Sequence, residues 1–177
     1  MKKILVIIEL FIVFLILYFL QSNFFSWYNI LGVAPNLFII LILFLGLFMG
    51  KTYGFIFGII LGLILDFFIG TKIGINAIVM GITGIFGAIL DKNFSKDSRI
   101  TLMFMVFSST IIFELIFYVL QILICDMQIE LLPFLKIIII EIIYNLMITI
   151  IIYPGFQRFG NYVQNVFTKD KGFIKYF

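Results

Sequence analysis

Residues 46–76 read GLFMGKTYGFIFGIILGLILDFFIGTKIGIN, and this stretch decides the fold. Only two short breaks interrupt its apolar residues, Gly50-Lys51-Thr52 and Gly70-Thr71-Lys72, and each contains a glycine and a lysine. A lysine at the centre of a bilayer costs about 2.5 to 3.5 kcal/mol, and glycine favours turns. Both breaks are therefore predicted to be tight hairpins at a membrane surface, which divide residues 36–90 into three short helices.

The composition of the whole chain also favours a membrane location. Of its 177 residues, 64% are hydrophobic and only 12% are charged, whereas soluble domains contain about 25% charged residues. A water-soluble fold cannot hide so much apolar surface, because a compact core still leaves a large exterior in contact with solvent. The sequence predicts an all-α integral membrane protein in which residues 1–177 form one transmembrane domain, a bundle of six helices. The predicted helices are about 4–20, 36–49, 53–69, 73–90, 101–125 and 134–153, and residues 157–177 form a basic cytoplasmic tail.

The basic residues predict the topology, because lysine and arginine in short loops stay on the cytoplasmic side of the membrane. With six spans and a cytoplasmic N-terminus, ten of the twelve basic residues lie in the cytoplasm. These ten are Lys2, Lys3, Lys51, Lys92, Lys96, Arg99, Arg158, Lys169, Lys171 and Lys175. Only Lys72 and Lys136 fall on the outer side, so both termini are predicted to be cytoplasmic.

The residue types limit the chemistry of the chain. It has no histidine and one cysteine, Cys125, which excludes disulfide frameworks, Cys/His metal sites and histidine acid/base catalysis. The basic residues are scattered over short loops, so nucleic acid is not an expected partner. No pattern for a nucleophile with its base or for a phosphate loop is present, and we expect no catalytic residue, metal or cofactor.

Small residues recur every four positions along the central stretch, and within helix 53–69 this spacing places Gly54, Gly58, Gly62 and Asp66 on one helix face. Small residues at this spacing let two helix backbones approach closely, so this face is expected to pack against a neighbouring helix. A seam that binds a partner is the alternative. The series comprises Gly54, Gly58, Gly62, Asp66, Gly70 and Gly74, and Asn76 follows it.

Asp66 lies near the outer end of helix 53–69. An ionised carboxylate in or near hydrocarbon is costly, so Asp66 should pair with a donor such as Lys72, Asn76 or a free backbone N–H. The simplest role is a cap that fixes the turn between the third and fourth helices. Contact with a ligand or partner is the alternative.

Three further acids, Glu9, Glu114 and Glu141, lie within apolar spans, and Glu9 is near the inner surface. The helices of Glu114 and Glu141 carry more polar residues at helical spacing, so each is predicted to turn a polar face inward. Interhelical hydrogen bonds of about 0.6 to 2 kcal/mol each are expected, with a polar cavity or proton path as the alternative. The additional polar residues are Tyr118 and Gln121 in one helix and Tyr144, Asn145 and Thr149 in the other.

A resemblance to a known family rests on the order of these motifs. Pro35-Asn36 opens the second helix, an apolar run follows, and the sequence continues as Gly54-x3-Gly58-x3-Gly62-x3-Asp66-x3-Gly70-x3-Gly74-x-Asn76. Over residues 35–90 this pattern resembles the family of the rod shape-determining protein MreD, and Pro154 with Arg158 agrees near the end of the chain. The resemblance implies a six-helix fold similar to the S components of energy-coupling factor transporters.

The resemblance also implies a function and partners. The chain would be a non-catalytic, multi-pass component of the bacterial inner membrane, within the complex that elongates the cell wall. Its implied partners are the bitopic protein MreC directly, the filament protein MreB, and less directly the RodA glycosyltransferase with its transpeptidase, besides membrane lipids. The motif from Pro35 to Asn76 would bind a partner or maintain the fold.

Two other functions compete with this one. A small-solute transporter, or its substrate-binding S component, could line a pocket with Glu114, Tyr118, Glu141 and Asn145. A membrane enzyme would need acids clustered at a membrane surface, whereas the four intramembrane acids are spread over four predicted helices. Co-purification of a vitamin rather than MreC would favour the transporter.

Overall fold

The computed structural model describes residues 2–69, 72–125, 128 and 130–168, and this part of the chain contains helices and short connections without any β-strand. Among these residues, five helical segments are long and apolar enough to cross a membrane. The prediction of an all-α membrane protein is thus confirmed. The segments are Lys2–Trp27, which begins with α1 (Lys2–Phe19), α4 (Lys51–Ile69), α5 (Ile75–Asn93), α6 (Arg99–Cys125) and α7 (Leu131–Thr168), and a shorter helix is α3 (Leu37–Met49).

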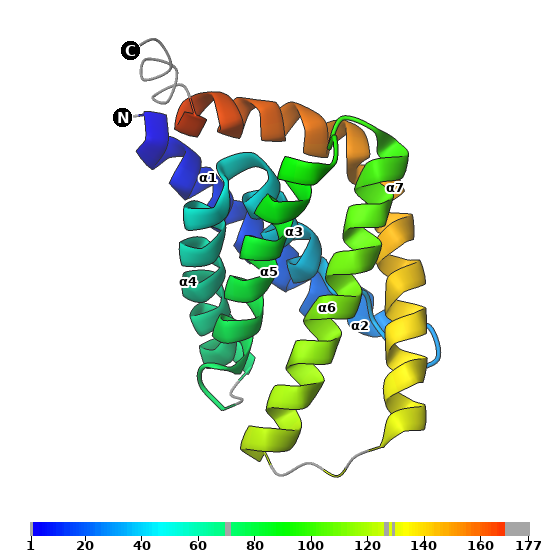
Figure 1. The fold of residues 1–177 in the computed structure, drawn as a ribbon. Coiled ribbons are helices and arrows are strands. Elements are labelled where there is room, and N and C mark those ends of the chain that lie inside the picture. Colours follow the sequence, from blue (N-terminus) through cyan, green and yellow to red (C-terminus); the bar gives the residue numbers. More distant parts are fainter. Residues whose placement is uncertain (1, 70–71, 126–127, 129, 169–177) are drawn as a thin grey trace.

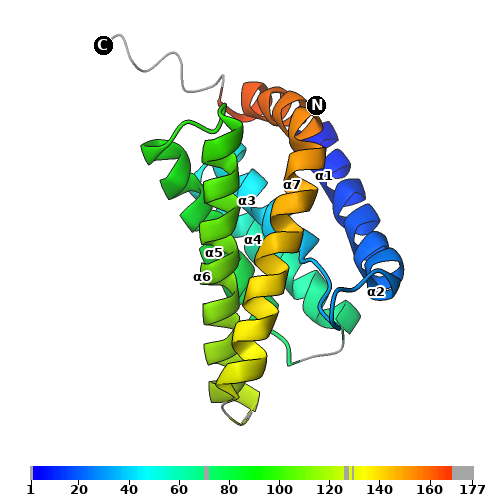
Figure 2. The same cartoon turned by 90° about the vertical axis from the view of Figure 1, so that its right-hand side faces the viewer.

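The helices surround α3 (Figure 1). The pair α4 and α5 lies on one side and the pair α6 and α7 on the other, while α1 crosses the bundle diagonally. α3 contacts α1, α4, α5, α6 and α7. Figure 2 shows, as Figure 1 does, that the start of α1 and the end of α7 lie at the same end of the molecule.

α3 forms the core of the bundle. All 13 of its residues are buried, as expected for a helix that is apolar on every side. At 1.5 Å per residue it is about 20 Å long, which is shorter than the hydrocarbon layer of about 30 Å. Gly50 ends α3 with φ +86°, a conformation that favours glycine, and α4 begins at Lys51. The first predicted hairpin is therefore a turn of a single residue.

The first helix extends beyond the predicted range 4–20. After α1 the chain continues through a π-helical turn (Leu20–Phe24) and α2 (Phe25–Trp27). The Ser22 hydroxyl donates to the Tyr18 carbonyl oxygen at 2.7 Å, and the Asn23 amide donates to the Phe19 carbonyl oxygen at 3.0 Å. Because these polar side chains bond carbonyls of the preceding turn, they accompany a wider helical turn and do not end the helix.

The last helix also differs from the predicted range 134–153. α7 contains Pro154 and continues to Thr168, and its final part turns aside across the end of the bundle (Figure 1). Proline removes one backbone hydrogen bond and kinks a helix without always ending it. We call residues 155–168 the C-terminal arm, and residues 169–177 of the predicted tail lie outside the described residues.

The C-terminal arm is held by one apolar face. Phe156, Gly160, Val163 and Phe167 are buried and recur at helical spacing. The ring of Phe156 packs edge-on against Phe44 of α3, with 4.9 Å between the ring centroids. This packing explains why the helix continues after Pro154.

Candidate functional site

The glycines of α4 face the backbone of α5. A Cβ added to Gly58 would lie 2.5 Å from the Met80 carbonyl oxygen. One added to Gly84 would lie 2.3 Å from the carbonyl oxygen of Gly54, and one added to Gly62 would also meet α5 backbone at 2.5 Å. Protein interiors are too closely packed to absorb such overlaps. This face of α4 is therefore occupied by α5, and the glycines make that contact sterically possible.

Asp66 joins the end of α4 to the start of α5. Its buried carboxylate accepts hydrogen bonds from the Gly74 N–H at 2.8 Å and from the Asn76 N–H and side-chain amide at 3.1 and 2.8 Å. A negative charge at a helix N-terminus is also favoured by the helix dipole. Asn76 and the backbone thus supply the expected donors, whereas Lys72 instead donates to the carbonyl oxygen of Ile124.

A second polar cluster lies where α3 begins, between α6 and α7. The buried Asn145 accepts a hydrogen bond from the Asn36 N–H at 3.0 Å and donates to the Thr110 hydroxyl at 3.2 Å. The Gln21 side chain accepts from the Leu37 N–H at 2.9 Å. Two backbone donors at the start of α3, which have no partner within the helix, are satisfied in this way.

Two buried carboxyl groups meet in the same cluster. Glu114 of α6 and Glu141 of α7 are 8% and 5% exposed, and their carboxyl groups are within hydrogen-bonding reach of each other. The side chain of Asn36 also reaches Glu114, and that of Asn145 reaches Glu141. Glu141 Oε1 and Asn36 Oδ1 have no hydrogen-bond partner among the described residues. The two polar faces predicted from the sequence therefore face each other.

Glu114 also borders a pocket between α6 and α7, which we call the polar pocket. Its volume is about 590 Å³, and Glu114 lines it together with Tyr118. The Tyr118 ring stacks on Phe134 with 4.0 Å between the ring centroids, and its hydroxyl accepts from the Glu130 N–H at 2.9 Å. The other lining residues are Phe117, Gln121, Gln128, Glu130, Pro133 and Ile137.

A second hollow, which we call the apolar groove, lies between α1, α3 and α7. Its volume is about 620 Å³. Gly155 forms part of its wall, and a Cβ added there would meet no atom within 4 Å. The groove is lined by Val13, Leu17, Leu20, Phe25, Leu37, Ile40, Leu41, Phe44, Ile148, Ile151, Ile152, Gly155, Phe156 and Phe159.

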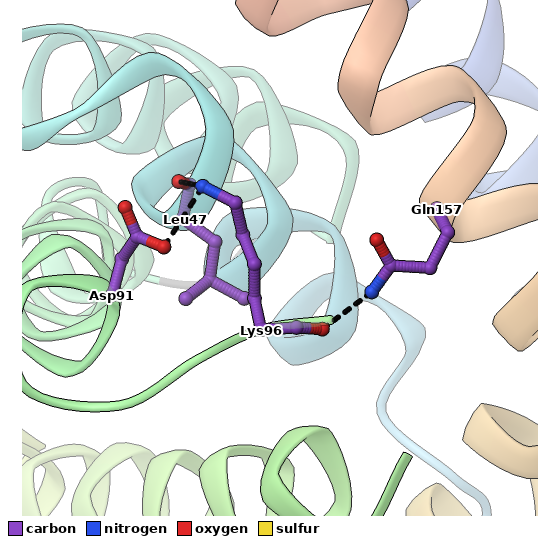
Figure 3. Close-up of polar contacts among 4 residues, drawn as sticks. All are labelled: Leu47, Asp91, Lys96 and Gln157. Carbon is purple, nitrogen blue, oxygen red and sulfur yellow. Dashed lines mark hydrogen bonds and ion pairs between the residues drawn. The ribbon is translucent and has the colours of Figure 1, made fainter. Parts of the chain in front are cut away.

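Lys96, between α5 and α6, is a buried cation. The sequence predicted it only as one of the basic residues on the cytoplasmic side. Its ammonium group donates to the Leu47 carbonyl oxygen at 2.8 Å and pairs with Asp91 at 2.8 Å (Figure 3). Leu47 lies in the last turn of α3, where carbonyl groups lack helical partners and the dipole favours a cation. Gln157 of the C-terminal arm donates to the Lys96 carbonyl oxygen, so one residue links α3, α5 and the arm.

Replacing Lys96 by methionine is expected to lower the free energy of unfolding by about 1.5 to 3 kcal/mol, the range for hydrogen bonds to charged groups. The exposed Lys92 is the matched control, and its replacement by methionine should change stability by less than about 0.5 kcal/mol. Unfolding of the purified protein in mixed micelles with increasing dodecyl sulfate measures both. Equal stability of the two variants would contradict a structural role for the Lys96 ammonium group.

Three predicted residues lie outside these clusters or outside the described chain. Pro35 is buried two residues before the first residue of α3, where its missing N–H leaves no donor unpaired. Glu9 is half-buried on α1, and its Oε2 has no hydrogen-bond partner among the described residues. Gly70 is not among the described residues.

Comparison with known proteins identifies the family. The model of the family described as rod shape-determining protein MreD matches residues 1–163. No curated protein matches the chain. No solved structure matches it either, so the expected likeness to S components of energy-coupling factor transporters is not confirmed and the transporter alternative gains no support.

The family has a role in rod shape determination and is part of the rod-shape system with MreC and MreB. It is a structural component of that system and is not a known family of enzymes. Because the match covers well over half of the chain, and the helices suit a multi-pass membrane protein, the chain belongs to the family of the rod shape-determining protein MreD.

Proposed function

We propose that this protein is a non-catalytic component of the cell-wall elongation complex in the bacterial inner membrane, where it holds the bitopic protein MreC. The family match over residues 1–163 is the observation that carries this proposal. Most described residues are in helices. A partner would therefore contact helix faces inside the bilayer, the short connections or the C-terminal arm.

The apolar groove is the surface that suits the transmembrane helix of MreC. Only a helix crosses the hydrocarbon layer alone without leaving backbone groups unpaired, so a bitopic partner presents one helix to this protein. The groove is lined by apolar residues of the helical segment Lys2–Trp27, of α3 and of α7. The open space above Gly155 would let a helix backbone approach closely, which favours association where lipid removes the hydrophobic incentive.

The distribution of basic residues supports a cytoplasmic location for both termini. The α3–α4 and α5–α6 connections lie at the same end of the molecule as the start of α1 (Figure 1). Lys51, Lys96 and Arg99 belong to these connections or adjoin them. By the positive-inside rule this end faces the cytoplasm. MreB would approach from this side, and RodA with its transpeptidase would associate less directly.

A leucine at Gly155 is expected to reduce recovery of co-expressed MreC by about tenfold, because its side chain would fill the apolar groove. A Cβ added at Gly155 meets no atom within 4 Å, so we expect the bundle itself to keep its stability. Recovery of MreC with the tagged protein in mild detergent, measured by quantitative mass spectrometry, gives the result.

Ile139, which is 57% exposed on α7 and lies outside the groove, provides the control. Its replacement by phenylalanine adds bulk elsewhere on the same helix and should leave MreC recovery unchanged. Equal recovery with both variants would exclude the groove as the docking surface. Failure of the unmodified protein to recover MreC would contradict the scaffold function itself.

A further inference from the structure

Three exposed lysines at one end of the bundle are unpaired within the described part of the chain. Lys2 is the first residue of α1, Lys51 is the first residue of α4, and Lys92 lies in the last turn of α5. All three side chains are exposed, and none has a hydrogen bond or an ion pair with a described residue. We call these three lysines the basic rim. Their ammonium groups are therefore available to a partner outside the chain.

The two lysines at the opposite end of the bundle differ from the basic rim. Lys72 donates to the carbonyl oxygen of Ile124, and Lys136 donates to that of Leu31 at 2.9 Å. The positive-inside rule accounts for the side of the membrane on which a lysine lies, but it does not require the side chain to stay unpaired. The unpaired state of the basic rim thus needs a separate explanation.

The acids near the basic rim do not neutralise it. Asp91 of α5 pairs with the buried Lys96 at 2.8 Å (Figure 3). Asp97 is exposed in the α5–α6 connection, but one carboxylate cannot balance three lysines. The exposed Arg99 and Arg158 add further positive charge at this end. The surface is therefore complementary to a partner with negative charge.

Each lysine of the basic rim shares a helix face with an exposed apolar residue three or four positions away. These neighbours are Leu5 beside Lys2, Phe55 beside Lys51 and Ile89 beside Lys92, and they are 55%, 40% and 45% exposed. On a helix that spans a membrane, such apolar side chains face lipid. The lysines on the same faces thus lie where hydrocarbon gives way to headgroups, and their long stems let the ammonium groups reach that layer.

We propose that the basic rim binds the headgroups of anionic phospholipids in the cytoplasmic leaflet. Lysines close to an anionic leaflet are attracted to it, and the lipid-facing position of the rim favours a lipid over a soluble phosphate compound. Because α4 and α5 are antiparallel neighbours (Figure 1), Lys51 and Lys92 act on the same part of the leaflet. The proposal rests on the orientation proposed above, but it does not depend on the binding of MreC.

Quenching of a single tryptophan by brominated lipid tests the proposal. Trp27 is the only tryptophan of the chain, so Trp27→Phe with Ile89→Trp places one reporter beside Lys92. The full chain is reconstituted in vesicles that mix phosphatidylcholine with anionic phosphatidylglycerol, and one lipid or the other carries bromine on its acyl chains. The two quenching curves give the relative binding constant of the lipids at the reporter. We expect phosphatidylglycerol to be favoured by about fivefold.

A reporter at the opposite end of the same helix pair is the matched control. Phe67, near the end of α4, is 68% exposed, so Trp27→Phe with Phe67→Trp places the tryptophan in lipid far from the basic rim. The two lipids should bind about equally there, because the rim lysines are out of reach. The same preference at both reporters would contradict a site at the basic rim.

Removal of the charges provides the second test. In the Ile89→Trp protein, Lys51→Gln with Lys92→Gln should lower the preference for phosphatidylglycerol from about fivefold to about one. Both side chains are exposed and unpaired among the described residues, so helicity by circular dichroism should be unchanged. If the double variant does not fold, Lys92→Gln alone should lower the preference to about twofold or less.

Equal binding of the two lipids at the Ile89→Trp reporter would overturn the proposal and leave an acidic cytoplasmic protein as the partner of the basic rim. A preference that persists unchanged in the folded glutamine variants would also overturn it. Neither result bears on the recovery of MreC, so failure of this proposal is distinguishable from failure of the scaffold function.

Discussion

An alanine at Gly84 is expected to disrupt the packing of α4 on α5. Its Cβ would lie 2.3 Å from the Gly54 carbonyl oxygen, which belongs to the backbone and cannot rotate away. This overlap can be relieved only if the two helices separate, and that separation weakens the dispersion contacts along the whole helix pair. We expect a loss of about 3 kcal/mol or more in the free energy of unfolding, measured in mixed micelles with increasing dodecyl sulfate.

Gly81, in the same helix, provides a matched control. A Cβ added there would lie 3.0 Å from the Ile59 side chain and 3.3 Å from the Phe55 ring, and both can move. Alanine is also a better helix former than glycine by about 1 kcal/mol. Gly81→Ala should therefore change stability by less than about 1 kcal/mol. If Gly81→Ala destabilises the protein as much as Gly84→Ala, backbone contact between α4 and α5 is not the reason.

Removal of the Asp66 carboxylate is expected to be the other large effect. Asp66→Ala leaves the N–H groups of Gly74 and Asn76 and the Asn76 amide without their acceptor at a buried turn. Unpaired buried donors and the lost charge-assisted bonds together cost on the order of 3 to 5 kcal/mol. The same unfolding measurement in mixed micelles gives this loss.

Asp66→Asn removes the negative charge of Asp66 but keeps the shape of its side chain, so it tests the contribution of the charge alone. The amide keeps one acceptor oxygen in place, so its loss of stability should fall between those of the unmodified protein and Asp66→Ala. Glu130→Ala removes an exposed acid at the same end of the molecule and should change stability by less than about 0.5 kcal/mol. An Asp66→Ala variant as stable as Glu130→Ala would show that Asp66 does not cap α5.

The differences between prediction and structure lie at the ends of the first and last helices. From the local sequence, the last helix is predicted to end before Pro154, but the aromatic contact between Phe156 and Phe44 keeps the following residues helical. Likewise, the first helix is predicted to end at about residue 20, but Ser22 and Asn23 bond to preceding carbonyls and the chain stays helical to Trp27. In both cases interactions made by the folded chain outweigh the weak local preference of a few residues.

The candidate site likewise contains some features that the sequence predicted and others that it did not. The position of Asp66 and the spacing of the glycines predicted a cap and a packing face, because both features act between helices that are neighbours in the chain. Nothing in the local sequence distinguishes Lys96 from the other basic residues of its segment. Its burial depends on α3, whose last turn lies 49 residues earlier in the chain.

The sequence by itself determined that this protein is an all-helical membrane protein with a glycine face suited to close helix packing, since composition and a four-residue spacing act locally, whereas the structure showed that α5 occupies this face. Only the tertiary structure decided that Glu114 and Glu141 meet beside a pocket and that Lys96 is buried. The physical reason is that these contacts depend on the register between neighbouring helices. How far α6 is shifted along α7 depends on side-chain packing over their whole length, and no short stretch of sequence contains that information.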